Sequence, residues 1–282
     1  MPKKGKPLKM NPQEEARLFR RLLRALVDDP VVWGWNAGVD KATDLASAVY
    51  LGLDNAGIAI DKSLSTNAAR RIETQFAGLD RRHRAAFLRA YRVAFSVNIE
   101  PLLQSKQTSA FMLRQLKVNV DLIRLIKRKH LPKVAEGVKQ ALKDAPFSRS
   151  HLKRYFRREW GYQDYPLRRI ARDQVNKAIG NFNQIRQQEV GITNYEWLTA
   201  GENRVRESHA ENDGQSFAWG KAPSTGHPGF DIQCRCQAIG IIPPSLARSA
   251  KLGYARDLAS IPKSWYRDSH LSSELSYLAF VS

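Results

Sequence analysis

Residues 195–242 read YEWLTAGENRVRESHAENDGQSFAWGKAPSTGHPGFDIQCRCQAIGII, and they contain the clearest strand signals in the chain. Apolar residues alternate with polar ones over Thr193–Thr199, which predicts a β-strand. The runs Phe217–Gly220 and Ile232–Ile242 predict two more strands, separated by a loop rich in Gly and Pro. Asn203–Ala210 is predicted to form a short helix or turn. Because two strands alone are marginal in water, we expect the three strands to form a small antiparallel β-meander that packs on a helix.

That helix is predicted directly upstream, at Pro166–Glu189. Its apolar residues recur at helical spacing, and its length would be roughly 36 Å. Gly191 follows at the position where a left-handed residue is favoured after a helix. The predicted fold class is therefore α+β, with a mainly α-helical body and a long helix packed on a small sheet. The predicted inward side of the long helix consists of Ile170, Val175, Ala178, Phe182 and Ile185.

Helical periodicity also covers most of the chain before the long helix. The predicted helices are Asn11–Val27, Ala37–Asp61, Asn67–Val97, Asp121–Lys143 and Ser148–Trp160. His83 lies within the apolar stripe of the third, so we expect it to be packed and hydrogen-bonded. Four regions result: a flexible basic arm (1–10), a helical body (11–160), a helix-plus-sheet unit (161–243), called the sheet module below, and an extended C-terminal tail (244–282).

The charge of the chain is strongly positive. Its 282 residues include 46 Lys and Arg against 27 Asp and Glu, a net charge of +19, and the pI is about 10.1. Such an excess favours a polyanionic partner, although a cationic surface that is merely solvated is the alternative. Without a base-reading motif, we expect non-specific, salt-dependent binding of double-stranded DNA. The candidate DNA-binding residues are Lys3, Lys4, Lys6, Lys9, Lys127, Arg128, Lys129, Lys153, Arg154, Arg157 and Arg158.

Three aromatic residues lie among the last of these cations: Tyr155, Phe156 and Trp160. Their rings either stack on bases beside the phosphate-binding cations or pack in the core.

The two cysteines, Cys234 and Cys236, lie so close in sequence that a disulfide between them would close a small, strained ring. We therefore expect reduced thiols, which suits assembly in a cytoplasm. Together with His209 and either His227 or Asp213, they provide the donors of a tetrahedral structural Zn²⁺ site, and the predicted metal set is Cys234, Cys236, His209 and His227. Burial as small apolar side chains explains the cysteines equally well. A Cys/His nucleophile would need a third orienting group, and no nucleophile motif surrounds the pair.

The order of residues in the sheet module resembles a known family. The matching residues are Ile170–Lys177 (IARDQVNK), Gly191–Ile192, Tyr195–Trp197, Thr199, Arg204–Arg206, His209, Asp213–Gly214, Pro223 and Cys234–Cys236. Over about residues 118–242 the chain resembles the phage head morphogenesis family, the minor head proteins of the Mu F-like type. The family tends to have an aspartate just before its Arg-Val-Arg, where this chain has Glu202-Asn203. The family-motif positions are Arg172, Asp173, Trp197, Thr199, Arg204, Arg206, His209, Asp213, Gly214, Cys234 and Cys236.

The resemblance implies a minor capsid protein of a tailed bacteriophage or prophage. Such a protein is assembled in the host cytoplasm and lies in several copies inside the capsid near the portal vertex. Its expected partners are the portal protein, neighbouring capsid or neck proteins and packaged double-stranded DNA, and it would aid head assembly and genome ejection. No membrane partner and no catalytic residue are predicted. The alternatives are a non-specific DNA-binding protein outside the virion, and a Cys/His hydrolase acting in head maturation.

Overall fold

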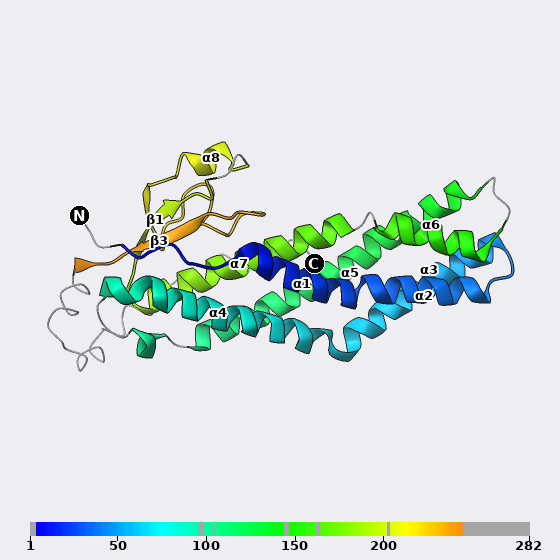
Figure 1. Ribbon diagram of the computed structural model, residues 1–282, viewed down its shortest axis with the longest axis horizontal. Coiled ribbons are helices and arrows are strands. Elements are labelled where there is room, and N and C mark those ends of the chain that lie inside the picture. The colour runs from blue at the N-terminus through cyan, green and yellow to red at the C-terminus, as the bar shows by residue number, and fades with distance from the viewer. Residues whose placement is uncertain are drawn as a thin grey trace.

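The computed structural model describes residues 4–95, 99–103, 105–143, 147–161, 164–201 and 204–244. Its elements are α1 (Pro12–Leu26), α2 (Asp28–Lys41), α3 (Leu45–Ser63), a π-helical turn (Leu64–Ala68), α4 (Ala69–Phe95), a 3-10 turn (Glu100–Leu102), α5 (Ser105–Ala141), α6 (Arg149–Gly161), α7 (Asp164–Glu189), β1 (Asn194–Leu198), α8 (Glu207–Ala210), β2 (Ser216–Ala218) and β3 (Gln237–Ile241). The longer helices form an elongated body, and the sheet lies near one end of it, beside α7 (Figure 1). The predicted α+β class is confirmed. The predicted tail lies outside the described residues from residue 245 onward.

Local sequence signals set the first helices. Asn11 caps α1, as predicted, because its Oδ1 accepts a hydrogen bond from the Glu14 N–H at 3.2 Å. The single helix predicted for Ala37–Asp61 is wrong. The structure has two helices there, α2 and α3, and α2 begins directly after α1. Asp44 ends the turn between them, since it forms a capping box with Ser47 at the start of α3.

Glycines allow α2 and α3 to pack unusually closely. A Cβ atom at Gly38 would lie 2.1 Å from the carbonyl oxygen of Leu51, and one at Gly34 would lie 2.4 Å from that of Asn55. Gly52 of α3, which looks in the sequence like a helix interruption, lies against a tryptophan ring of α2. The two backbones therefore touch where side chains would otherwise separate them.

A buried polar group joins α4 to α7. His83 is fully buried in the apolar stripe of α4, as predicted. Nη1 of Arg186 lies 2.7 Å from Nδ1 of His83, and Nη2 lies 2.5 Å from Oδ1 of Asp80. A guanidinium group only donates, so Nδ1 of His83 is the acceptor and the imidazole is neutral. Burial lowers the pKa of His83 well below its usual value of 6.5, and the charge of Arg186 lowers it further.

This arrangement predicts a loss of stability in mild acid. Below pH 6.5 the unfolded chain binds a proton at His83 that the folded chain does not bind. The free energy of unfolding should therefore fall as the pH drops from 6.5, by up to about 1.4 kcal/mol per pH unit from this group. The measurement is urea unfolding between pH 5 and 8 for the wild type and His83→Gln, whose amide oxygen can still accept from Arg186. The variant should show a shallower dependence, and equal slopes would contradict the assignment.

Helices α5 and α6 complete the body. Helix α5 begins well before its predicted start and continues through Pro132. Helix α6 follows the prediction closely. Phe156 on its inner side stacks on Trp35 of α2, with ring centroids 3.9 Å apart and planes 9° apart. Trp160 donates from Nε1 to Oδ1 of Asp28 at 3.1 Å. None of the helices in the described residues combines the length and apolar character needed to cross a bilayer.

The sheet has β1 in its centre, with β2 and β3 antiparallel on either side. Tyr195 pairs with Phe217 on one side and with Gly240 on the other. Strand β3 begins at Gln237, so the strand predicted for 232–242 is wrong over its first residues. The backbone there turns instead, and Gln233 has a φ of +57°.

The N-terminal arm lies along the outer edge of β3 rather than extending freely (Figure 1). The Gly5 N–H donates to the Gly240 carbonyl at 3.0 Å, and the Leu8 N–H donates to Oε1 of Gln237 at 3.0 Å. Leu8 is buried. The prediction of a flexible arm over 1–10 is therefore wrong for residues 4–10, because this segment covers an otherwise open sheet edge.

Buried amides of α7 attach the sheet to the helical body. Asn183 and Gln187 both donate to the carbonyl oxygen of Ala238, at 2.9 and 2.8 Å. The indole Nε1 of Trp219 donates to Oε1 of Gln187 at 2.9 Å. At the end of α4, the hydroxyl of Tyr91 accepts from the Gly240 N–H at 2.9 Å. The sheet is thus held to two helices by polar contacts that require one orientation.

Candidate functional site

Three ligand-type side chains of the sheet module converge on one point: His209, Cys234 and Cys236, called the Cys/His cluster below. Nδ1 of His209 lies 3.6 Å from the Sγ atom of each cysteine. All three ligand atoms lie within 4.8 Å of one another. The three side chains are buried, and both cysteines are free thiols. Two sulfurs and one imidazole nitrogen form a donor set that suits Zn²⁺.

An acid holds the outer nitrogen of the imidazole. Nε2 of His209 lies 3.5 Å from Oδ2 of Asp231. Arg206 positions that carboxylate, because its Nη1 lies 3.0 Å from Oδ2 and its Nη2 donates to the Ile232 carbonyl at 2.6 Å. Trp197 packs edge-on against the imidazole, with ring centroids 5.3 Å apart. A proton on Nε2, directed at Asp231, leaves the lone pair of Nδ1 facing the sulfurs.

A turn stabilised by α7 places the cysteines. Oδ1 of Asp173 accepts from the N–H of Gln233 at 2.8 Å and so holds the left-handed residue just before Cys234. The Gly229 N–H donates to Sγ of Cys234 at 3.3 Å. A hydrogen bond from the Cys236 thiol lowers the pKa of Cys234 to about 6, and the same contact raises the pKa of Cys236.

Other family-motif residues build the loop that carries α8. Oδ1 of Asp213 accepts from the Thr199 N–H at 2.7 Å. Gly214 has a φ of +74°, which favours glycine, and its N–H donates to the carbonyl of Trp197 at 2.8 Å. These contacts close the loop against the end of β1. The two remaining motif residues, Arg172 and Arg204, are exposed.

His227 is not part of the cluster, so the predicted four-residue metal set is wrong at that position. Its Nδ1 lies 2.8 Å from the hydroxyl of Tyr195, and its ring packs against Trp219 with centroids 4.9 Å apart. Burial lowers its pKa. Asp213, the alternative fourth ligand, bonds to the backbone at Thr199 instead. His227 and Asp213 thus contact Tyr195 and Thr199, and neither is grouped with the cysteines.

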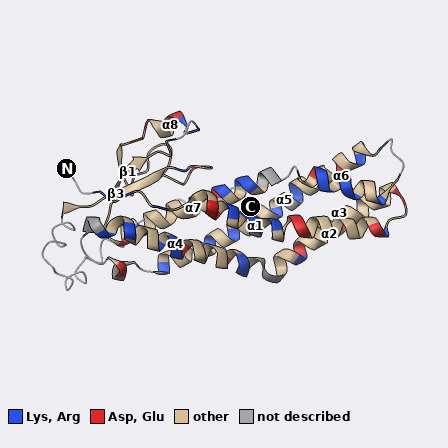
Figure 2. Ribbon diagram, in the orientation of Figure 1, with Lys and Arg blue, Asp and Glu red and all other residues tan. Residues whose placement is uncertain are grey.

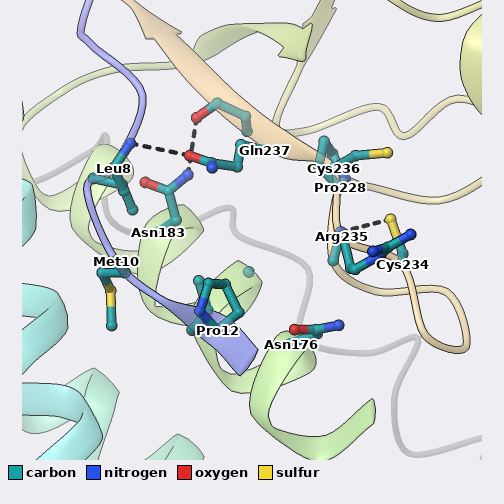
Figure 3. Close-up of a pocket in the computed structure, with 14 residues that line it drawn as sticks. Leu8, Met10, Pro12, Asn176, Asn183, Pro228, Cys234, Arg235, Cys236 and Gln237 are labelled. Carbon is teal, nitrogen blue, oxygen red and sulfur yellow. Dashed lines mark hydrogen bonds between the residues drawn. The ribbon is translucent and has the colours of Figure 1, made fainter. Parts of the chain in front are cut away.

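A small cavity lies beside the cysteine segment. Its volume is about 40 Å³, and it is bounded by the N-terminal arm, α7 and the segment from Cys234 to Ala238. Figure 3 shows Met10 and Pro12 on one side of the cavity, with the sulfurs of Cys234 and Cys236 turned away from them. A space of this size holds about one water molecule. Both thiols are buried, and this burial does not favour the Cys/His hydrolase alternative.

The predicted DNA-binding residues are scattered over the helical body and the arm. Lys4 pairs with Glu196, Lys153 pairs with Asp40, and Arg158 pairs with Glu159, so three of these cations have an acidic partner in the protein itself. Lys3 and the side chain of Lys127 lie outside the described residues. The exposed members are Lys6, Lys9, Arg128, Lys129, Arg154, Arg157 and Arg158. Figure 2 shows Lys and Arg along the helices of the body, whereas the strands are mostly neutral.

Helix α6 presents the most regular group of these cations. Arg154, Arg157 and Arg158, called the cationic face below, are spaced so that they share one exposed side of the helix. The opposite side of the helix is buried in the body. A row of guanidinium groups on a rigid helix can contact successive phosphates.

The aromatic residues of α6 have different environments. Phe156 and Trp160 are buried, so they pack in the core and are not available to bases. Tyr155 is half-buried, and the guanidinium carbon of Arg158 lies 4.5 Å from its ring centroid. Of the two alternatives, packing is therefore correct for Phe156 and Trp160.

Sequence reasoning missed several residues of the site. Asp231 was not identified, although it lies three positions before Cys234 and is the acid nearest to the cysteine pair in the sequence. Asn183 and Gln187 were not identified either, and only their polar character on a mostly apolar helix side could have indicated them. The role of Gly229 depends on its backbone N–H and leaves no sequence signal.

Comparison with known proteins finds similarity over a region that contains most of the sheet module. Residues 133–239 match the family model of Phage Mu protein F like protein. An uncharacterized protein of Haemophilus influenzae is 38% identical over 125 residues, which make up 44% of this chain and 28% of that protein. The chain thus aligns with little more than a quarter of this relative. No solved structure matches the chain. Residues 133–239 are therefore similar to the Mu F-like family of phage proteins.

Proposed function

We infer that the protein is a minor capsid protein that associates with the portal inside the head, contacts packaged DNA and aids head assembly and genome ejection. The observation that carries this proposal is the match to the Mu F-like family over 133–239, which begins within α5 and includes α6, α7 and the sheet. Within it, α7 is joined to the turn before Cys234 by a hydrogen bond that Asp173 accepts, and to β3 by hydrogen bonds that Asn183 and Gln187 donate. A unit held in one orientation is suited to docking on a fixed partner.

The sheet module is the part proposed to dock on the portal or a neighbouring capsid protein. Within it, Ile232 is a large apolar side chain that is 54% exposed, next to Asp231 and close to the Cys/His cluster. An exposed apolar side chain on an ordered turn is the kind of residue that an interface covers. The helical body would then extend away from the docking surface.

The experiment is co-purification with the portal protein of the same phage or prophage. Ile232→Asp should weaken co-purification without unfolding the protein, because the side chain is exposed. Ile58→Asp is the matched control, since Ile58 is 56% exposed and lies on α3 of the helical body, outside the sheet module. Equal recovery of the portal with both variants and the wild type would contradict docking through this turn. No portal recovery with the wild type would favour the alternative of a free-standing DNA-binding protein.

The DNA contact is assigned to the cationic face of α6. Replacing Arg154 and Arg157 by glutamine should weaken binding to a random-sequence duplex by about 30-fold at 0.15 M salt if each arginine contacts one phosphate. The slope of log K against log salt should become smaller by about 2, since two fewer counterions are released. Fluorescence anisotropy over a range of salt concentrations measures both quantities.

A second double variant controls for net charge. Arg204 and Lys221 are exposed cations of the sheet module, and their replacement by glutamine changes the net charge by the same amount. We expect this variant to bind DNA nearly as well as the wild type. An equal loss in both double variants would mean that only the overall charge matters, and no loss in either would remove DNA contact from the proposal.

A further inference from the structure

We propose that His209, Cys234 and Cys236 bind one Zn²⁺ ion, with Asp231 holding the imidazole from outside the coordination sphere. This assignment is independent of the proposed place in the phage head. It concerns the stability of the sheet module and follows from the geometry of the Cys/His cluster.

The separations of the ligand atoms fit a tetrahedral zinc ion. With Zn–S bonds of about 2.3 Å and a Zn–N bond of about 2.05 Å, tetrahedral angles place sulfur and nitrogen about 3.6 Å apart and the two sulfurs about 3.8 Å apart. The two observed separations between Nδ1 of His209 and the sulfurs are both 3.6 Å. The sulfur–sulfur separation is within the 4.8 Å that bounds the group. The two nitrogen–sulfur separations therefore match those of a tetrahedral zinc site.

Hydrogen-bond donation by His209 alone does not explain this convergence. A neutral imidazole nitrogen either donates one proton or accepts one, so Nδ1 of His209 cannot satisfy two thiols as a donor. The carboxylate of Asp231 at Nε2 favours the tautomer in which Nδ1 carries no proton, which is the form that binds a metal. Arg206 in turn holds Asp231. Metal-bound histidines commonly have such a carboxylate partner on the other ring nitrogen.

A backbone donor also faces one of the two sulfurs. The Gly229 N–H donates to Sγ of Cys234 at 3.3 Å. A divalent cation would allow both sulfurs to lose their protons, because it supplies the positive charge that the pair lacks. Soft sulfur donors with one imidazole select Zn²⁺ over Mg²⁺ or Ca²⁺.

Within the described residues, no further His, Cys, Asp or Glu atom joins these three. We therefore assign the fourth coordination position to a solvent molecule. The ion would link α8 to the segment from Cys234 to Cys236, just before β3. Since the sheet has three short strands and a small core, this link would stabilise a unit that is otherwise marginal.

The test begins with the full-length, untagged wild-type protein in a reducing, chelator-free buffer. Elemental analysis should find about one zinc per chain. After zinc removal, titration with Co²⁺ should give the ligand-field bands of a tetrahedral site together with thiolate-to-cobalt charge-transfer bands, saturating at one equivalent and displaced by Zn²⁺. Zinc should also slow the reaction of both thiols with a thiol reagent. A folded wild-type protein that takes up neither ion, or only octahedral Co²⁺, would overturn the assignment.

Variants identify the ligands. Cys236→Ser and His209→Gln should lose the charge-transfer bands or bind at least 100-fold more weakly, whereas His227→Gln is the matched control and should keep one equivalent. Asp231→Asn should weaken binding by about 10- to 100-fold, the effect expected for an outer partner of a ligand. Retention of wild-type affinity in both Cys236→Ser and His209→Gln would overturn the assignment. If either variant fails to fold, the wild-type titration still decides the outcome.

Discussion

Replacing Phe156 by alanine should lower the free energy of unfolding by about 4 kcal/mol. The ring is fully buried and stacks on Trp35, with centroids 3.9 Å apart. Its removal would leave a cavity between α2 and α6 that the neighbouring helices cannot fill, because α2 is already held in close contact with α3. Urea unfolding followed by circular dichroism measures the change.

Tyr155 provides the control for this substitution. It is the adjacent aromatic residue, it is half-buried, and its ring contacts Arg158 on the surface of α6. Tyr155→Ala should therefore cost about 1 kcal/mol or less. A small cost for Phe156→Ala combined with weaker DNA binding would contradict the packing described above, since it would mean that the buried ring is available to nucleic acid.

Replacing Gly38 by alanine should lower the free energy of unfolding by about 2 to 3 kcal/mol. A methyl group there would lie 2.1 Å from the carbonyl oxygen of Leu51, so α2 and α3 would have to separate. Intrinsic helix propensity alone favours alanine over glycine by about 1 kcal/mol, which makes the predicted sign informative. Thermal or urea unfolding of the variant provides the measurement.

The same substitution at Gly137 should change the free energy of unfolding in the opposite direction. Gly137 lies in the interior of α5, and a Cβ atom there would meet nothing within 4 Å. Gly137→Ala should therefore raise the free energy of unfolding by up to about 1 kcal/mol. If both variants were stabilised, the close approach of α2 and α3 would be incorrect.

The spacing of apolar residues was sufficient to predict those helices that bury one continuous apolar side. The stripe that contains His83 and the long helix α7 were both predicted in this way, and both are helices in the structure. Helix α2 was missed over its first residues because Pro30 and Gly34 weaken helical propensity there. Gly34 and Gly38 are favourable only because α3 packs against them. A contact with another helix cannot be predicted from a short stretch of sequence.

Contacts between distant segments were also beyond local reasoning. Residues 4–10 are basic and contain two glycine or proline positions that suggest a free chain, yet they lie on the edge of β3 through Gly5 and Leu8. The edge exists only once the sheet has formed. The start of β3 was misplaced for a related reason, since Asp173 of α7 stabilises the turn at Gln233.

The kinds of side chain at the candidate site were predicted from the sequence, but the full set of residues was not. The cysteine pair and His209 were identified because sulfur and imidazole groups are rare in this chain, which has 2 cysteines and 6 histidines. Choosing between His209 and His227 required the positions of Trp197 and Tyr195 on β1, since each histidine packs against one of these rings. Asp231 gains its role only after His209 is placed beside it.

Quantitative mass spectrometry of purified phage particles tests the central claim most directly. Procapsids and DNA-filled heads would be separated, and the copy number of this protein would be measured relative to the portal and the major capsid protein. The account predicts a few copies per particle in both forms, with peptides from the Mu F-like domain over 133–239 present in the mature head. Abundant protein in the free lysate together with its absence from both kinds of particle would contradict a role as a minor capsid protein.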